Sequence, residues 1–261
     1  MPLGQGKGIL LCGVQRSGTN MMMRVLDRML VTEVYNEYDE LAFQLYSLRD
    51  LETIKSLHSK SRAAFFGLKI LQELDRVGEI AEIFPSVAVI WQYRDYRDVV
   101  NSHMVSWPGF RECIDEMASD RAAGAWRGKG ITDEHYRLLQ EYYRPDLSDG
   151  SCVALFWYLR NTLLFTQKLD HSPRTVMVPY EWLVASPAEA LKAVCAQIGL
   201  PYDPRIHSFV HSRSISKRTP PHIDPAVEQL CDEMTRKLDE TAKKHFPYFP
   251  IDQYRRPYSP I

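Results

Sequence analysis

A glycine-rich loop with one arginine is the first stretch of the sequence that could bind an anion. Residues 11–20 read LCGVQRSGTN, where Gly13 and Gly18 have the spacing of a Walker loop but Thr19 replaces the Walker lysine. The cation is Arg16, whose planar guanidinium can bind two oxygens of a tetrahedral anion. The N-terminus of the following helix would add its positive end. The loop predicts a phosphate or sulfate site without an evident magnesium ligand; a strand-to-helix turn with a solvated arginine is the alternative.

A second loop has the residues to bind another anion. Residues 94–102 read RDYRDVVNS, with Arg94 at the end of an apolar run and Ser102 two turns into an expected helix. The carboxyl ends of neighbouring parallel strands meet at one edge of a sheet, so the two loops would lie at the same edge. Arg94 and Ser102 would suit a second anion farther along one ligand.

Apolar runs and helical spacing predict the scaffold that positions these loops. Continuous apolar runs, typical of strands buried on both faces, occupy residues 8–14, 63–70, 86–93 and 174–179. Stretches with helical spacing or helix caps occupy residues 18–30, 95–105, 152–169 and 187–198. This order predicts an α/β fold with a three-layer, doubly wound and mainly parallel sheet, whose ligands bind beyond the carboxyl ends of the strands.

Length and composition are those of one globular enzyme domain. The chain has 261 residues, 45% hydrophobic and 25% charged, and we expect a single domain over residues 1–261. Charged and turn-forming residues at about 107–150 predict a helical insert, and we expect a C-terminal basic loop and helix at about 210–245.

Charge, hydropathy and cysteine content exclude several kinds of partner. The formal net charge of −1 argues against a nucleic-acid partner. No apolar run approaches the roughly 20 residues that span a bilayer, so we expect no membrane span. The five cysteines lack metal-binding spacing, which predicts reduced thiols and no metal site, and we expect a cytoplasmic protein.

The two loops together resemble the donor-binding motifs of the sulfotransferase family. GVQRSGTN is similar to the family's 5′-phosphosulfate loop and RDYRDVVNS to its 3′-phosphate motif, with which members bind 3′-phosphoadenosine 5′-phosphosulfate (PAPS). Residues 178–204, VPYEWLVASPAEALKAVCAQIGLPYDP, resemble the family's Tyr-Glu-x-Leu segment, the helix after it and a Gly-Leu-Pro turn. The matches stand in the family's order. They imply a P-loop-like sulfotransferase fold.

The resemblance implies roles for the matching donor-site residues. Those implied to hold the 5′-phosphosulfate are Arg16, Ser17, Gly18, Thr19 and Asn20. Those implied to hold the 3′-phosphate and the adenine are Arg94 and Ser102, and Tyr180 respectively. The segment SRSISKRTPP supplies Arg213, Lys217 and Arg218, which resemble the family's C-terminal basic loop although its usual glycine is absent. An exposed basic loop is the alternative for that segment.

Sulfuryl transfer needs in-line positioning, neutralisation of negative charge and a base for the acceptor proton. Arg16 can stabilise the leaving phosphate, and Lys69, in FFGLKI, resembles a lysine that many family members keep on this strand. Leu71 stands where several relatives have a histidine base. Some family branches place a glutamate base in the segment TEVYNEYDELAF, which predicts Glu37; a solvated or capping carboxylate is equally consistent. The segment also offers Glu33, Asp39 and Glu40, of which Glu33 and Glu40, together with His103, are alternative bases.

The sequence thus predicts a sulfotransferase that moves a sulfuryl group from PAPS to a hydroxyl acceptor and releases 3′,5′-adenosine bisphosphate (PAP), without a metal ion. The acceptor would be a carbohydrate, a glycolipid or a small metabolite. One alternative is a PAPS- or PAP-binding module without catalysis, which the missing histidine favours. A P-loop kinase is another alternative, opposed by the missing Walker lysine.

Overall fold

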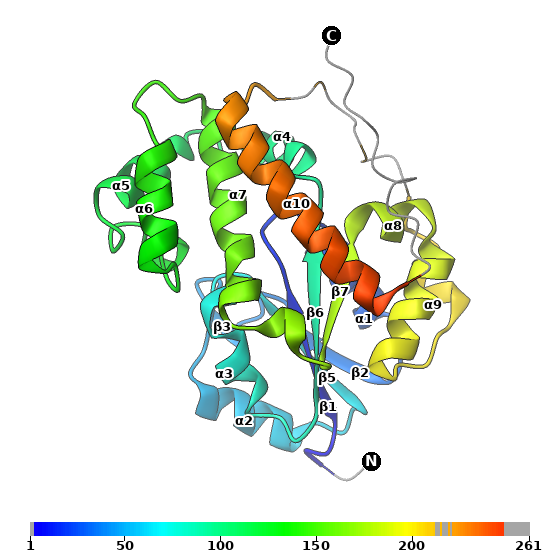
Figure 1. The fold of residues 1–261 in the computed structure, drawn as a ribbon. Coiled ribbons are helices and arrows are strands. Elements are labelled where there is room, and N and C mark those ends of the chain that lie inside the picture. Colours follow the sequence, from blue (N-terminus) through cyan, green and yellow to red (C-terminus); the bar gives the residue numbers. More distant parts are fainter. Residues whose placement is uncertain (1–2, 212–214, 216–218, 220, 248–261) are drawn as a thin grey trace.

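A five-stranded parallel sheet forms the centre of the protein (Figure 1). The computed structural model describes residues 3–211, 215, 219 and 221–247. The strands of this sheet are β1 (Lys7–Cys12), β2 (Thr32–Tyr35), β5 (Phe65–Ile70), β6 (Val87–Tyr93) and β7 (Thr175–Pro179). Their order is β2-β5-β1-β6-β7, and every pairing is parallel. Ile9, Leu10 and Leu11 of β1 are fully buried, as expected for a central strand with helices on both faces.

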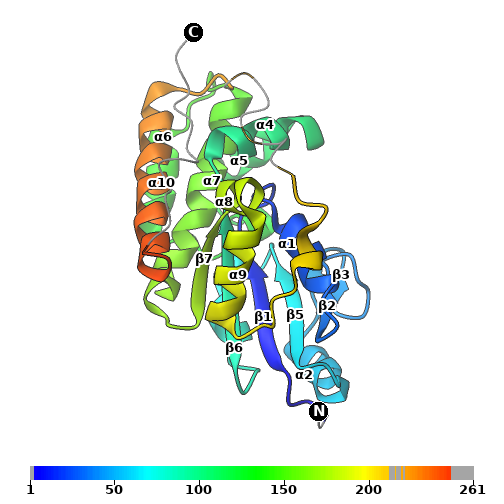
Figure 2. The ribbon, with the colours of Figure 1, turned by 90° about the vertical axis from the view of Figure 1, so that its right-hand side faces the viewer.

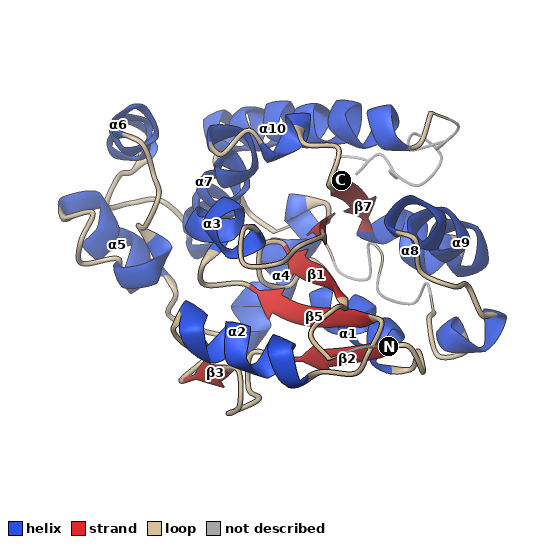
Figure 3. Ribbon diagram, turned by 90° about the horizontal axis from the view of Figure 1, so that it is seen from below, coloured by secondary structure: helices blue, strands red, loops and turns tan. Residues whose placement is uncertain are grey.

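Helices cover both faces of the sheet. The helices of the core and its C-terminal part are α1 (Thr19–Asp27), α2 (Leu51–Lys60), α3 (Val77–Ala81), α4 (Tyr96–Ser106), α7 (Asp149–Thr166), α8 (Tyr180–Ala185), α9 (Pro187–Ile198) and α10 (Pro225–His245). Figures 2 and 3 show α7 and α10 on one side of the sheet and α1 on the other. The predicted doubly wound α/β fold is therefore confirmed. None of the helices in the described residues has the length and apolar character to cross a membrane.

Local sequence explains where the core elements begin and end. All four apolar runs form strands of the central sheet, and TEVY adds β2 at its edge. The predicted N-cap of α4 is present, because the Asp95 carboxylate accepts a hydrogen bond from the Arg97 backbone N–H at 2.9 Å. Helix α9 ends at Gly199, whose φ of 77° is the left-handed conformation that glycine favours. Helix α1 is shorter than the predicted 18–30, since it ends at Asp27 before β2.

Two further pieces lie beside the core. Helices α5 (Arg111–Ser119) and α6 (Asp133–Tyr142), with the short 3-10 helix η2 (Ala125–Arg127) between them, stand next to α7 away from the sheet (Figure 1). A small antiparallel hairpin, β3 (Phe43–Gln44) and β4 (Ser47–Leu48), follows β2. The hairpin was not predicted from the sequence.

The pairing register places the carboxyl ends of the three central strands side by side. Cys12, the last residue of β1, pairs with Ile70 of β5 and with Trp91 of β6. The segments that follow β1, β5 and β6 therefore leave the sheet at the same edge. This edge is where an open α/β sheet binds its ligands.

Candidate active site

The loop after β1 has a conformation that requires both of its glycines. Gly13 has φ 147°, and a Cβ atom there would lie 2.2 Å from the Gln92 carbonyl oxygen. Gly18 has φ 93°, and a Cβ atom there would lie 2.1 Å from the Tyr180 ring. Arg16 is also left-handed, with φ 71°. The loop thus lies close to β6 and to the start of α8. At Gly13 and Gly18, any residue other than glycine would be strained and would collide with these neighbours.

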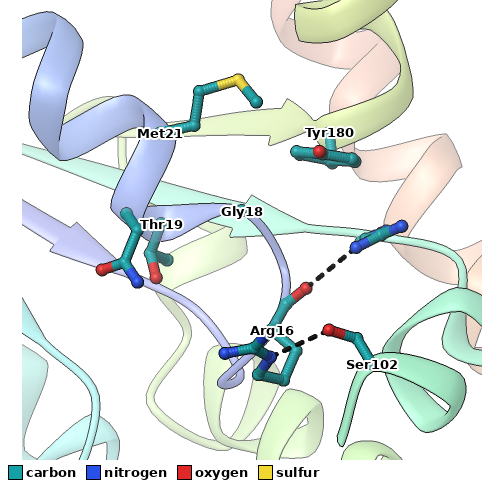
Figure 4. Close-up of a pocket in the computed structure, with 8 residues that line it drawn as sticks. Arg16, Gly18, Thr19, Met21, Ser102 and Tyr180 are labelled. Carbon is teal, nitrogen blue, oxygen red and sulfur yellow. Dashed lines mark hydrogen bonds between the residues drawn. The ribbon is translucent and has the colours of Figure 1, made fainter. Parts of the chain in front are cut away.

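The two predicted anion-binding loops meet in one pocket. The pocket has a volume of about 290 Å³ and is lined by Arg16, Gly18, Thr19, Asn20, Met21, Arg94, Ser102 and Tyr180 (Figure 4). Arg16 Nε donates a hydrogen bond to Ser102 Oγ at 2.9 Å, and Arg94 Nη1 donates one to the Arg16 carbonyl at 3.4 Å. These contacts join the loop after β1 to the loop and helix after β6. Strands β1 and β6 are neighbours in the sheet.

Ser17 is the predicted donor-site residue of this loop that does not line the pocket. Its side chain is fully buried, and its hydroxyl has no hydrogen-bond partner among the described residues. A buried hydroxyl without a partner costs free energy, so such a group usually marks a ligand or water site. Helix α1 likewise has Gly18 as its N-cap residue and no side-chain cap hydrogen bond in the described part of the chain. Both observations fit an anion at the start of α1.

The pocket carries two positive charges. Burial and the neighbouring Arg94 guanidinium lower the pKa of Arg16. Arg94 is buried, forms an ion pair with Asp98 at 3.2 Å and lies over the Tyr180 ring with its Cζ 4.5 Å from the ring centroid. Two guanidiniums from adjacent loops would attract a ligand with two anionic groups.

A second cluster lies around Lys69, next to the pocket. The Lys69 side chain is 1% exposed; its ammonium forms an ion pair with Glu37, donates to the Asn20 side-chain oxygen and donates to that of Asn36 at 3.2 Å. Burial lowers the pKa of Lys69, Glu37 opposes this shift and Arg16 adds to it. Lys69 therefore links the start of α1 to the segment after β2. Its ion-pair partner Glu37 is 17% exposed.

The alternative bases lie in other surroundings. Glu33 accepts hydrogen bonds from Tyr35 Oη at 2.5 Å and Ser61 Oγ at 2.7 Å, so both of its carboxylate oxygens are occupied. Glu40 is exposed. Among the acids of this segment, Glu37 is the one that contacts Lys69.

His103 is buried among aromatic rings rather than in the pocket. Its ring centroid lies 4.8 Å from that of Trp107 and 4.2 Å from that of Phe110. Burial, together with Arg16 and Arg127, lowers the pKa of His103 to about 4. The side chain thus points away from Ser102, as expected for neighbours on a helix.

Sequence reasoning missed two residues of the site. Met21 lines the pocket, and Figure 4 shows it with Tyr180 at one end, away from Arg16 and Ser102. Its place in the first turn of α1 was the available signal. Asn36 was also missed; its side-chain oxygen accepts from Lys69 and, at 3.0 Å, from the backbone N–H of Glu37.

Two expectations need separate statements. The predicted basic residues Arg213, Lys217 and Arg218 lie outside the described residues. Within the described ranges, no cluster of three or more His, Cys, Asp and Glu side chains could hold a metal ion.

The parallel α/β sheet carries a glycine loop and two arginines at the carboxyl ends of its strands, a set of groups suited to an anionic ligand. The chain belongs to the sulfotransferase family, because the model of that family matches residues 30–204. The protein is therefore a transferase of sulfuryl groups. The matched region contains Glu37, Lys69, Arg94 and Tyr180 and begins after the glycine loop.

Solved structures support the same fold. The chain resembles a sulfotransferase from Alicyclobacillus acidocaldarius with 14% identity and a TM-score of 0.55, over 96% of this chain and 99% of the other. It also resembles the sulfotransferase domain from the curacin biosynthetic pathway with 12% identity and a TM-score of 0.53, over 88% of this chain and 98% of the other. No curated protein matches the sequence significantly.

Proposed function

We propose that the protein transfers the sulfuryl group of PAPS to a hydroxyl group of a carbohydrate, a glycolipid or a small metabolite and releases PAP. The observation that carries this proposal is the single pocket in which Arg16 and the start of α1 meet Arg94 and Ser102. PAPS has two separate anionic groups, and the two loops offer a site for each.

The donor would lie along the pocket between these loops. Its 5′-phosphosulfate would accept hydrogen bonds from Arg16, from the N-terminal backbone of α1 and from the buried Ser17 hydroxyl. Its 3′-phosphate would bind Arg94 and Ser102. Ser102 can serve both sites, because its hydroxyl oxygen accepts from Arg16 while its own proton is available for donation.

The adenine would lie at the other end of the pocket. Tyr180 offers a ring and Met21 a polarisable side chain there (Figure 4). Gly18 supports this assignment, since any side chain at this position would collide with the Tyr180 ring. Thr19 and Asn20 complete the wall beside the phosphosulfate.

Transfer then follows from the positions of three charged side chains. The acceptor oxygen forms a bond to sulfur while the bond from sulfur to the bridging phosphate oxygen breaks, and the electron pair leaves with PAP. Glu37 takes the acceptor proton. Arg16 stabilises the charge that develops on the leaving phosphate. Lys69 orients the Glu37 carboxylate through their ion pair.

Leu71 at the usual histidine position favours one other function, a PAPS-binding module without catalysis. The experiment that separates the two is incubation of the protein with PAPS labelled in the sulfuryl group and a panel of hydroxyl acceptors. Transfer of the label to an acceptor, with stoichiometric release of PAP, is the expected result. PAPS binding without transfer to any acceptor would favour the module, whereas magnesium-dependent ATP binding that PAPS cannot displace would favour a kinase.

A further inference from the structure

Arg127, at the end of η2, is a half-buried arginine with no carboxylate partner among the described residues. Its Nε atom is buried and has no hydrogen-bond partner in that part of the chain. Its guanidinium carbon lies over the rings of Trp126 at 4.7 Å and Phe110 at 5.5 Å. Arg121 of the same segment instead forms an ion pair with Asp133 at 2.7 Å. A buried Nε–H group without a partner is costly, and this favours a ligand that supplies an acceptor, such as an anion.

The backbone next to Arg127 is linked through Arg160 to the segment that follows β5, the strand of Lys69. The carbonyl oxygen of the neighbouring Trp126 accepts a hydrogen bond from Arg160 Nη1 at 3.1 Å. Arg160 Nη2 binds the carbonyl oxygens of Leu71 at 3.1 Å and Gln72 at 2.8 Å. Because one guanidinium bridges these carbonyls, η2 lies next to the chain that leaves β5 just after Lys69.

A row of aromatic rings connects Arg127 with Arg16 of the donor pocket. Phe110, under Arg127, contacts His103, which contacts Trp107. The Arg16 guanidinium carbon lies 5.4 Å from the centroid of the Trp107 ring. Both Arg16 and Arg127 act on the pKa of His103, so both charges are near this row of rings.

The charges around η2 are not balanced equally. Arg160 is fully buried, and burial lowers its pKa to about 10. The nearby carboxylates of Asp75 and Glu73 oppose this shift. Arg127 adds a further positive charge on the side of η2 that faces Phe110. Within the described residues, these two carboxylates lie near Arg160, and no ion pair joins a carboxylate to Arg127.

We infer that Arg127 binds an anionic group of the acceptor, so that the acceptor carries a carboxylate, phosphate or sulfate in addition to the hydroxyl that is sulfated. The inference rests on the proposed function, because Glu37 pairs with Lys69 of β5 and Arg127 lies on the 3-10 helix that is bonded to the segment after β5. A planar guanidinium can bind both oxygens of such a group, which would also fix the orientation of the acceptor.

Anion binding at a fixed donor site is the direct test. PAP is first added to saturation so that the donor pocket is filled, and inorganic sulfate is then titrated calorimetrically into wild type, Arg127→Gln, Arg127→Lys and Lys129→Gln. Lys129 is an exposed lysine two residues away, so its variant removes the same charge from the same segment. We expect wild type and Lys129→Gln to bind sulfate alike, Arg127→Gln to bind it roughly tenfold to a hundredfold more weakly, and Arg127→Lys to be intermediate.

The outcomes separate the inference from the proposed function. Failure of every variant and of wild type to bind PAP would overturn the proposed function itself. Normal PAP binding with no sulfate site, or with a site that Arg127→Gln leaves unchanged, would overturn the inference alone. Loss of PAP binding in Arg127→Gln only would show a structural role and would also overturn it.

Turnover of matched acceptors extends the test to the substrate. The pair para-nitrophenyl glucuronide and para-nitrophenyl glucoside differs by one carboxylate on the same body. We expect wild type to have the higher kcat/KM with the glucuronide and Arg127→Gln to lose that preference while its rate with the glucoside stays the same. An equal loss with both acceptors, or a wild-type preference for the glucoside, would contradict the inference.

Discussion

At the scale of residues, the site depends on two contacts between segments that are distant in the sequence. Arg16 binds Ser102, which joins the first loop to the second, and Lys69 pairs with Glu37, which joins β5 to the segment after β2. The residues of the two loops pointed to Arg16 and Ser102, and the resemblance to the sulfotransferase family implied Lys69 and Glu37. The pairing itself depends on strand order, which one sequence does not display.

The Lys69–Glu37 pair leads to a prediction about the base. Glu37→Gln keeps the shape of the side chain and removes its basicity, so we expect turnover to fall by about 10² to 10⁴ while PAP affinity stays nearly constant. Single-turnover rates with labelled PAPS, together with PAP titration, check this. Glu40→Gln, at an exposed acid of the same segment, is the matched control and should keep the wild-type rate. A wild-type rate in Glu37→Gln would move the base elsewhere.

At the scale of elements, the β3–β4 hairpin is the part of the fold that the sequence did not predict. Its turn residues Leu45 and Tyr46 have φ values of 50° and 65° and are 87% and 60% exposed. Turns of this kind normally use Asn-Gly or Asp-Gly, so Leu-Tyr gave no hairpin signal. The hairpin is attached to the segment after β5, because Ser47 Oγ donates to Gln72 at 2.7 Å and the Leu48 N–H to Glu73 at 2.9 Å. Such contacts outweigh local turn preference.

Strain in this turn makes a prediction about stability. A left-handed conformation costs a residue other than glycine or asparagine about 1 to 2 kcal/mol. Relief at two positions amounts to about 2 to 4 kcal/mol, and the greater unfolded-state entropy of glycine offsets about 1 kcal/mol of it. The double variant Leu45→Asn, Tyr46→Gly should therefore raise the free energy of unfolding by about 1 to 3 kcal/mol, measured by urea denaturation. The opposite test is the double variant Leu45→Val, Tyr46→Val. It should lower the free energy of unfolding, since β-branched side chains fit a left-handed turn poorly. Equal stability of both variants would mean that the turn is not strained.

At the scale of the whole molecule, the sequence predicted the scaffold better than the surroundings of the site. Long buried strands such as 86–93 have continuous apolar patterns that only a covered sheet satisfies, and they were identified correctly. Arg127 belongs to no motif and Met21 had only its place in the first turn of α1 as a signal, because the role of each depends on what the fold brings beside it. The helix expected at 18–30 was too long since apolar spacing continued past Asp27.

Stability of the whole protein should depend on pH through His103. Its pKa is about 4 in the folded protein and about 6.5 in an unfolded chain, so the unfolded state binds more protons between these values. The free energy of unfolding should fall by up to about 3 kcal/mol as pH drops from 6.5 to 4, and this contribution should be constant above pH 6.5. His103→Phe should show a shallower decline in urea denaturation over that interval. The same slope in both proteins would contradict the assignment to His103.

Recognition of the donor by its two anionic groups is the central claim, and calorimetric titration with PAP and with adenosine 5′-phosphate tests it most directly. Wild type should prefer PAP, because only PAP offers a 3′-phosphate to Arg94 and Ser102. Arg94→Ala should lose roughly tenfold to a hundredfold in PAP affinity and most of that preference. Arg97→Ala, at an arginine three residues further on that is paired with Asp232 and lies outside the pocket, should keep it. Equal affinity of wild type for the two nucleotides would contradict the account.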